Sequence, residues 1–208
     1  MTKEEKVLEI NKRLIKLYPH PKVALDFTTP LELLVATIMS AQTTDKLVNT
    51  LTPALFKKYP TAKDFAEADV EDIRTLISKV NFSGNKAKNI KAAAQIIVEK
   101  HAGNVPDTME ELDALPGVAR KTANVVLGQA FHKAEGIAID THMIRMSNKL
   151  GLTTQKDPVK IERDLMEIVP RDLWIDWTAR LILFGRHECP ARPHECEGTL
   201  LWDLYVAK

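Results

Sequence analysis

The sequence contains few cysteines and no long apolar run. Two cysteines in 208 residues are too few for the disulfide framework that stabilises small secreted proteins. No apolar run reaches the roughly 18 residues that indicate a membrane span. The N-terminal segment, residues 1–10, fits an amphipathic helix rather than a signal peptide. These absences favour a soluble protein of the cytoplasm.

A strong excess of positive charge is also missing. The 29 lysines and arginines nearly balance 28 acidic residues, which gives a formal net charge of +1. This balance argues weakly against a nucleic-acid partner, because phosphate contacts usually require a basic surface. Local patches would have to supply such contacts, although a solvated helix face is the alternative for most of them. The candidates are Lys86, Lys88, Lys91, Arg120, Lys121, Arg145, Lys149, Arg186 and Arg192.

Alternating strand patterns are absent, and apolar residues recur at helical spacing. Three stripes are clear: Leu31, Leu34, Val35 and Ile38; Ile90, Ala93, Ala94 and Ile97; Leu173, Trp177, Leu181 and Phe184. Short breaks at 59–60, 82–84, 103–106 and 151–153 divide the chain into about ten helices. The predicted fold class is therefore all-α. Without a long linker or low-complexity stretch, composition by itself predicts one compact domain.

The most informative segment is Leu-Pro-Gly-Val-Ala-Arg-Lys-Thr-Ala-Asn-Val-Val-Leu-Gly at residues 115–128. A Pro-Gly turn precedes an alanine-rich apolar helix and places Lys121 in its first turn, where backbone N–H groups have no helical partner. Such a helix end attracts anions and favours the uncharged form of a lysine. The segment is thus predicted to provide both a phosphate-binding site and a nucleophilic amine. The alternative is a plain turn followed by a solvated surface lysine.

The surroundings of this segment match a known motif. Leu112, Leu115 and Val118 flank the turn as two packed helices require. Residues 108–131 resemble the helix-hairpin-helix of DNA repair glycosylases, and most closely that of the endonuclease III family. Ala119 is a departure, since many relatives carry a second glycine there. Alanine is tolerable if that residue is already helical, but it would obstruct a backbone that needs positive φ.

Three further segments resemble the same family, in the same order. Ile38-Met39-Ser40-Ala41-Gln42-Thr43-Thr44-Asp45 is similar to the segment beside the lesion pocket. Asn85-Lys86-Ala87-Lys88-Asn89-Ile90 is similar to the start of the following helix, and Ile139-Asp140-Thr141-His142 to the region of the catalytic aspartate. The resemblance therefore covers nearly the whole chain.

The resemblance implies two helical domains with a DNA-binding cleft between them. One is a helical barrel at 22–132 that includes the hairpin. The other joins 1–21 to 133–208 and contains a remnant of the loop that holds an iron–sulfur cluster in this family. The hairpin and Asp140 would flank the cleft. The implied partner is double-stranded DNA with a damaged base or an abasic site. We expect a monomer that is associated with the nucleoid and does not bind membranes.

The resemblance also implies a base-excision-repair DNA glycosylase with AP lyase activity that removes oxidised pyrimidines. Lys121 would attack the sugar C1′, expel the base and form a Schiff base that permits strand cleavage by β-elimination. Only a neutral amine attacks, so the site must favour the uncharged form or a neighbour must take the proton. Asp140 would stabilise the cationic sugar and assist proton transfer. For Asp140 the alternative is a plain helix N-cap.

Other residues align with family positions that contact DNA. Gln42 would bond to the orphaned base opposite the lesion, and Phe82, where leucine is common, would wedge between stacked bases. A core aromatic is the alternative for Phe82. The hairpin residues expected at the DNA are Gly117, Val118, Ala119 and Arg120, together with Arg145. Ser40, Asp45 and His142 align with pocket positions, and each is also a common cap or satisfied polar group.

The C-terminal segment departs from the family. Most relatives end in four cysteines, spaced six, two and five residues apart, that hold a [4Fe-4S] cluster. Cys189 and Cys196 keep the first spacing, but the next two positions fall on Thr199 and Tyr205. We therefore expect no cluster and no cofactor requirement. Apolar packing would then hold this segment in place of the cluster, through Leu200, Leu201, Trp202 and Leu204. Zinc bound by the two cysteines with His187 and His194 is the alternative.

Two other functions remain open. A helix-hairpin-helix module can bind DNA without catalysis, and a monofunctional mismatch or damage glycosylase removes the base only. A pure binding module needs neither Lys121 nor Asp140, and monofunctional relatives lack the lysine at that position. The bifunctional interpretation is therefore favoured, while the preferred damaged base is not given by the sequence.

Overall fold

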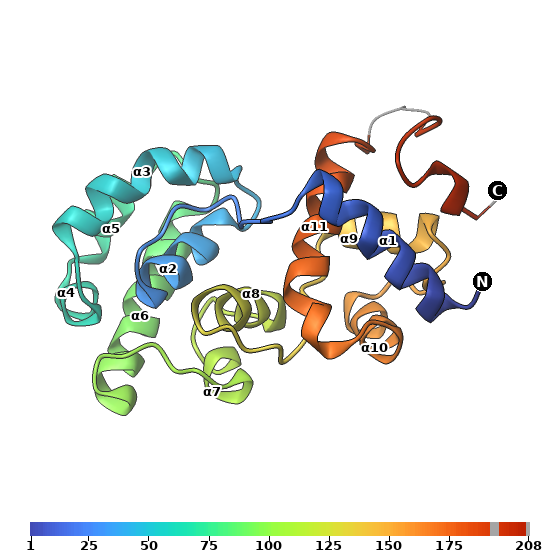
Figure 1. Cartoon of the computed structure of the whole chain (residues 1–208). Helices are drawn as coiled ribbons and strands as arrows, with labels where there is room; N and C mark the ends of the chain where they lie inside the picture. Colours follow the sequence, from blue (N-terminus) through green and yellow to red (C-terminus); the bar gives the residue numbers. More distant parts are fainter. Residues whose placement is uncertain (192–195, 207–208) are drawn as a thin grey trace. The chain divides into compact units, whose positions relative to one another are not determined.

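The computed structural model describes residues 1–191 and 196–206. All regular structure within these residues is helical, which confirms the predicted all-α class (Figure 1). No described helix is long and apolar enough to cross a membrane. The elements are α1 (Lys3–Leu17), α2 (Pro30–Ser40), α3 (Asp45–Lys58), α4 (Ala62–Glu67), α5 (Val70–Leu76), α6 (Ser83–His101), α7 (Met109–Asp113), α8 (Arg120–Ala130), α9 (Thr141–Lys149), α10 (Pro158–Ile168), η1 (Arg171–Leu173), α11 (Trp174–His187) and η2 (Trp202–Leu204).

Residues 23–133 form one compact unit with its own hydrophobic core. Helix α6 contacts α2, α4 and α5, and α2 also packs on α3 and α8. The predicted stripes face this core, since Leu34, Ile38, Ile90 and Ile97 are all buried. Burial of these apolar faces supplies the main stabilisation of the unit.

Most helices of this unit begin at a side-chain cap. Four of them begin at a threonine whose side chain accepts a hydrogen bond from the backbone N–H three residues later: Thr29, Thr44, Thr61 and Thr108. At the start of α5, the side chain of Asp69 accepts from the N–H two residues later. Helices α6 and α8 differ, because their N-cap residues are Phe82 and Ala119, which make no side-chain cap. Both exceptions coincide with segments predicted to contact DNA.

The second unit consists of residues 1–22 and 134–208. The structure describes all of these residues except 192–195 and 207–208. Helix α11 packs against α1 and α9. The predicted stripe on α11 is buried, with Trp177, Leu181 and Phe184 at 0% exposure. This unit therefore has a separate core.

The C-terminal segment is attached to the second unit by polar bonds as well as by packing. Arg13 on α1 binds both carboxylate oxygens of Asp203 and also the carbonyl of Leu200. Lys6 Nζ donates to the carbonyl of Leu204 at 2.9 Å. These long-range contacts were not predicted from the sequence.

The prediction of four packing residues in this segment is half wrong. Leu201 and Leu204 are buried, whereas Leu200 is 40% and Trp202 45% exposed. Residues 202–204 form a short 3-10 helix, η2, which turns only part of its apolar surface toward the core.

Candidate nucleic-acid interface and catalytic residues

The predicted hairpin is present as α7, a turn and α8. Gly117 at the turn has φ of 78°, and a Cβ added there would lie 2.9 Å from Cβ and Nδ2 of Asn89 on α6. Glycine is therefore required for both its backbone conformation and this close approach. The turn is fixed against α6 in the same unit.

The alanine that replaces a family glycine fits without strain. Ala119 has φ of −105° and ψ of 167°, an extended conformation that any L-residue adopts. It is the N-cap residue of α8, and its methyl group cannot accept a hydrogen bond. The N–H groups of the first turn are therefore not capped by this side chain, and they can bind an anion.

Lys121 is the second residue of α8, in the first turn as predicted. Its side chain is exposed, as is that of Arg120 before it, whereas Val118 is 7% exposed and packs in the core. Val118 thus anchors the hairpin while the two basic side chains face solvent.

Gln42 and Phe82 both lie on exposed segments in the left-handed region of backbone space. Their φ angles are 54° and 58°, values that residues with side chains rarely adopt. The Phe82 side chain is 63% exposed, which does not fit the alternative of a core aromatic. The nearby Ser40 donates through Oγ to the carbonyl of Thr37 at 3.0 Å, and Asp45 is the first residue of α3.

Several lysines predicted as candidate phosphate contacts are used inside the fold, which corrects that expectation. Lys86 is 5% exposed, and its Nζ donates to the carbonyls of Met39 and Ala41 at 2.7 and 2.6 Å. Lys91 Nζ donates to the carbonyl of Ala68 at 2.7 Å. Helical spacing shows which lysines share a face but not which of them reach a carbonyl of another helix. Arg192 lies outside the described residues.

Asp140 is the N-cap of α9, as its alternative interpretation predicted. Its Oδ1 accepts a hydrogen bond from the Met143 N–H at 2.8 Å. The preceding residues Ile137 and Ile139 are buried, so the start of α9 is anchored in the core. The cap fixes the position of the carboxylate and is compatible with a second, chemical role.

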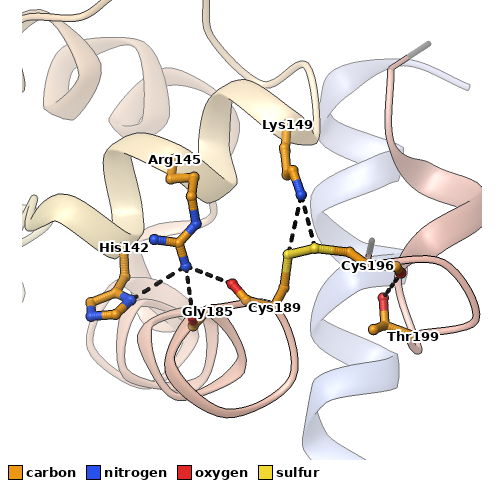
Figure 2. The surroundings of a disulfide bond; sticks show 7 residues. All are labelled: His142, Arg145, Lys149, Gly185, Cys189, Cys196 and Thr199. Carbon is orange, nitrogen blue, oxygen red and sulfur yellow. Dashed lines mark hydrogen bonds between the residues drawn. A yellow bond between two sulfur atoms is a disulfide. The ribbon is translucent and has the colours of Figure 1, made fainter. Parts of the chain in front are cut away.

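His142 and Arg145 interact on the same helix (Figure 2). Arg145 Nη2 donates to the carbonyls of Gly185 and Cys189, both at 2.6 Å, and lies 3.4 Å from His142 Nδ1. Burial, aided by the charge of Arg145, lowers the pKa of His142, while Asp140 opposes the shift. The imidazole is therefore neutral near pH 7.

The two cysteines are joined to each other in a disulfide bond, which the sequence analysis did not predict. Figure 2 shows Lys149 of α9 directed at this bond, with Nζ 2.8 Å from Cys196 Sγ and 3.3 Å from Cys189 Sγ. Both cysteines are buried. Two cysteines do not make a framework, but their spacing of seven residues permits one short loop closure.

The residues present do not fit a four-thiolate iron–sulfur cluster. The sulfurs of Cys189 and Cys196 are bonded to each other, and Thr199 Oγ1 donates to the Cys196 carbonyl at 2.6 Å. The ring of Tyr205 contacts that of Trp202 edge-on. No group of His, Cys, Asp or Glu suited to a metal occurs among the described residues, and His194 of the zinc alternative lies outside them.

The all-helical fold and the glycine turn between α7 and α8 are those of a helix-hairpin-helix protein. A sequence profile described as "HhH-GPD superfamily base excision DNA repair protein" matches residues 35–171. Endonuclease III of Synechocystis sp. is 50% identical, over 98% of this chain and 93% of that protein. Endonuclease III of Escherichia coli K12 is 41% identical, over 96% and 94%. The chain belongs to the endonuclease III family.

Solved structures agree with this assignment. A trapped endonuclease III–DNA covalent intermediate is similar with a TM-score of 0.91 and 37% identity, over 99% of this chain and 96% of that chain. A non-covalent endonuclease III–DNA complex also has a TM-score of 0.91 and 37% identity, over 99% of this chain and 95% of that chain. A thermostable thymine-DNA glycosylase, 20% identical with a TM-score of 0.86 over 97% of this chain and 95% of that chain, shares the fold.

Proposed function

We propose that this protein, a base-excision DNA glycosylase and AP lyase of the endonuclease III family, removes oxidised pyrimidines from double-stranded DNA through a Schiff base at Lys121. The observation that carries the proposal is the exposed position of Lys121 in the first turn of α8, beyond the glycine turn and without a side-chain cap at Ala119. We also propose that the protein acts as a monomer on DNA in the cytoplasm, at the nucleoid.

The chemistry is a nucleophilic substitution followed by an elimination. The neutral Nζ of Lys121 bonds to the sugar C1′ as the bond from C1′ to the base breaks, and the base leaves with a proton. Ring opening gives the Schiff base. Loss of a proton from C2′ then breaks the C3′–O bond and cleaves the strand. Asp140 stabilises the positive charge that develops on the sugar and assists the proton transfers.

The remaining site residues hold the DNA and the lesion. The backbone N–H groups of Gly117, Ala119 and Arg120 bind phosphate oxygens, which matches the uncapped start of α8. Val118, also expected at the DNA, is buried and its N–H donates to the Leu115 carbonyl at 3.1 Å, so it supports the turn instead. Gln42 and Phe82 fill the space left by the flipped base. Ser40, Asp45 and His142 each contact the lesion. Arg145 positions His142. Its Nη2 is held by the two backbone carbonyls to which it donates and lies 3.4 Å from His142 Nδ1.

A panel of duplex oligonucleotides, each with one defined lesion, tests the proposed function. We expect the purified protein to cleave strands that contain thymine glycol or another ring-saturated pyrimidine, to leave β-elimination ends, and to leave undamaged duplex intact. Binding without cleavage would instead support the non-catalytic module. Base release that leaves an uncleaved abasic strand would support a monofunctional glycosylase.

We also propose that the enzyme works without an iron–sulfur cluster and that the Cys189–Cys196 disulfide closes its C-terminal segment. The donor set supports this proposal, since the two sulfurs are bonded to each other and Thr199 and Tyr205 supply no thiolate. Arg13 and Lys6 add bonds from α1 to the same segment. A cluster is therefore not needed to hold these residues in place.

The purified protein is expected to be colourless, to show no iron–sulfur absorption near about 400 nm, and to keep its incision activity after treatment with a chelator. Thiol titration of the unfolded protein should detect both cysteines only after reduction, because the structure contains no free cysteine. A brown preparation with about four irons per chain would contradict the proposal. Stoichiometric zinc would support the zinc alternative.

A further inference from the structure

The segments of Gln42 and Phe82 are held in unfavourable backbone conformations by a small group of contacts within residues 23–133. Both residues have positive φ, which costs conformational energy for side chains larger than glycine. Asn81 next to Phe82 donates through Nδ2 to the Gln42 carbonyl and through its backbone N–H to Thr43 Oγ1. The two segments are therefore directly connected.

Lys86 provides a second and deeper connection. Its Nζ donates to the carbonyls of Met39 and Ala41 and to Thr43 Oγ1, at 2.7, 2.6 and 3.2 Å. Ala41 and Thr43 are the neighbours of Gln42 on either side. All three donors of the ammonium group are thus used on the segment that carries Gln42.

The same lysine is linked to Phe82 through its own helix. Lys86 lies in the first turn of α6, and its backbone N–H donates to the Phe82 carbonyl at 3.0 Å. One residue therefore contacts the Phe82 segment through its main chain and the Gln42 segment through its side chain.

The placement of this charge favours a positioning role over support of α6. A cation at the start of a helix faces the positive end of the helix dipole, so Lys86 is unfavourable for α6 itself. Its partners Met39 and Ala41 are at the end of α2, where carbonyls lack helical partners and the dipole is negative. Burial lowers the pKa of Lys86, and the carbonyl oxygens compensate the buried charge.

We propose that Lys86 is a positioning residue for opening the duplex, because it joins the Gln42 segment to the helix start at Phe82 so that both side chains enter the DNA as one unit. The proposal rests on the gap-filling role proposed for these two residues. Lys86 itself does not contact the substrate.

The experiment compares binding to a duplex with a tetrahydrofuran abasic analogue and to undamaged duplex. Lys86→Met keeps the aliphatic stem and removes the three hydrogen bonds, and we expect the ratio of the two affinities to fall roughly tenfold. Lys91→Met is the matched control, since Lys91 also lies on α6 and donates to a carbonyl, that of Ala68. This control should keep the wild-type ratio.

A double-mutant cycle separates positioning from loss of fold. Gln42→Ala and Phe82→Ala should each lower the affinity ratio, with a combined effect smaller than the product of the two, because the residues act as a unit. In the Lys86→Met protein the two residues should act independently, so the reduction in the affinity ratio for the double variant should equal the product of the two single reductions. If Lys86→Met does not fold, Asn81→Ala tests the same coupling, because Asn81 is exposed and bonds to the Gln42 carbonyl.

The outcomes distinguish the inference from the proposed function. If the Gln42 and Phe82 variants lower the affinity ratio but neither Lys86→Met nor Asn81→Ala changes their coupling, the positioning role is wrong and the gap-filling role stands. If the Gln42 and Phe82 variants leave the ratio unchanged, both roles are overturned, while cleavage of the lesion panel still tests the glycosylase.

Discussion

Replacing Lys121 by alanine is expected to abolish the covalent complex that borohydride traps between the protein and DNA with an abasic site. Reduction by borohydride fixes only a Schiff base, and the variant lacks the amine that forms it. The measurement is the fraction of labelled DNA that migrates with the protein on a denaturing gel. Wild-type protein should convert a large fraction, and the variant should show no such band.

DNA binding by Lys121→Ala should change only a few-fold, because one exposed side chain is lost and the hairpin N–H groups remain. Lys100→Ala serves as the control, since Lys100 is an exposed lysine at the end of α6 that is not among the candidate DNA contacts. This control should trap DNA as the wild type does. Efficient trapping by Lys121→Ala would assign the nucleophile to another amine.

The fold was predictable because its signals are local. The stripe on α11 and the turn at Gly117 each follow from residues within one or two helical turns of each other. The threonines before α2 and α7 are also visible as N-caps in the sequence. Where burial depends on residues that are close together in the sequence, the helical spacing of the apolar residues is sufficient to predict which face of the helix is buried.

The candidate site was predicted less completely because its geometry depends on distant residues. The sequence placed Lys86 among surface cations, yet its side chain reaches carbonyls 45 and 47 positions earlier in the chain. Nothing in the local pattern distinguishes it from Lys88, which is exposed. The positive φ of Gln42 and Phe82 was also not visible, because Gly or Asn is the usual signal for that conformation.

The C-terminal segment shows the same limit. The pairing of Cys189 with Cys196 was not predicted from the sequence, because that pairing depends on how the chain turns between them. Leu201 and Leu204 were predicted to be buried and are, whereas Leu200 and Trp202 are exposed. An apolar cluster in a short segment does not specify which of its members face the core.

Asp140→Asn should slow base removal by about 100-fold or more, the range expected when a group that stabilises charge or transfers protons is lost. The measurement is single-turnover release of the damaged base. Stability should change little, because the asparagine side-chain oxygen can still accept the Met143 N–H and asparagine caps helices as well as aspartate does. The substitution thus removes the negative charge and keeps the cap.

Asp157→Asn is the matched control for this experiment, because Asp157 caps α10 in the same way, through a 3.0 Å bond from the Lys160 N–H. The same change at this exposed cap should leave base release at the wild-type rate. Asp140→Ala adds the other half of the comparison, since it loses the cap as well as the charge and should also lower the free energy of unfolding by about 1 kcal/mol. If Asp140→Asn and Asp157→Asn release the base equally fast while only Asp140→Ala is impaired, Asp140 acts as a helix cap alone, and the charge on the sugar must be stabilised by another group.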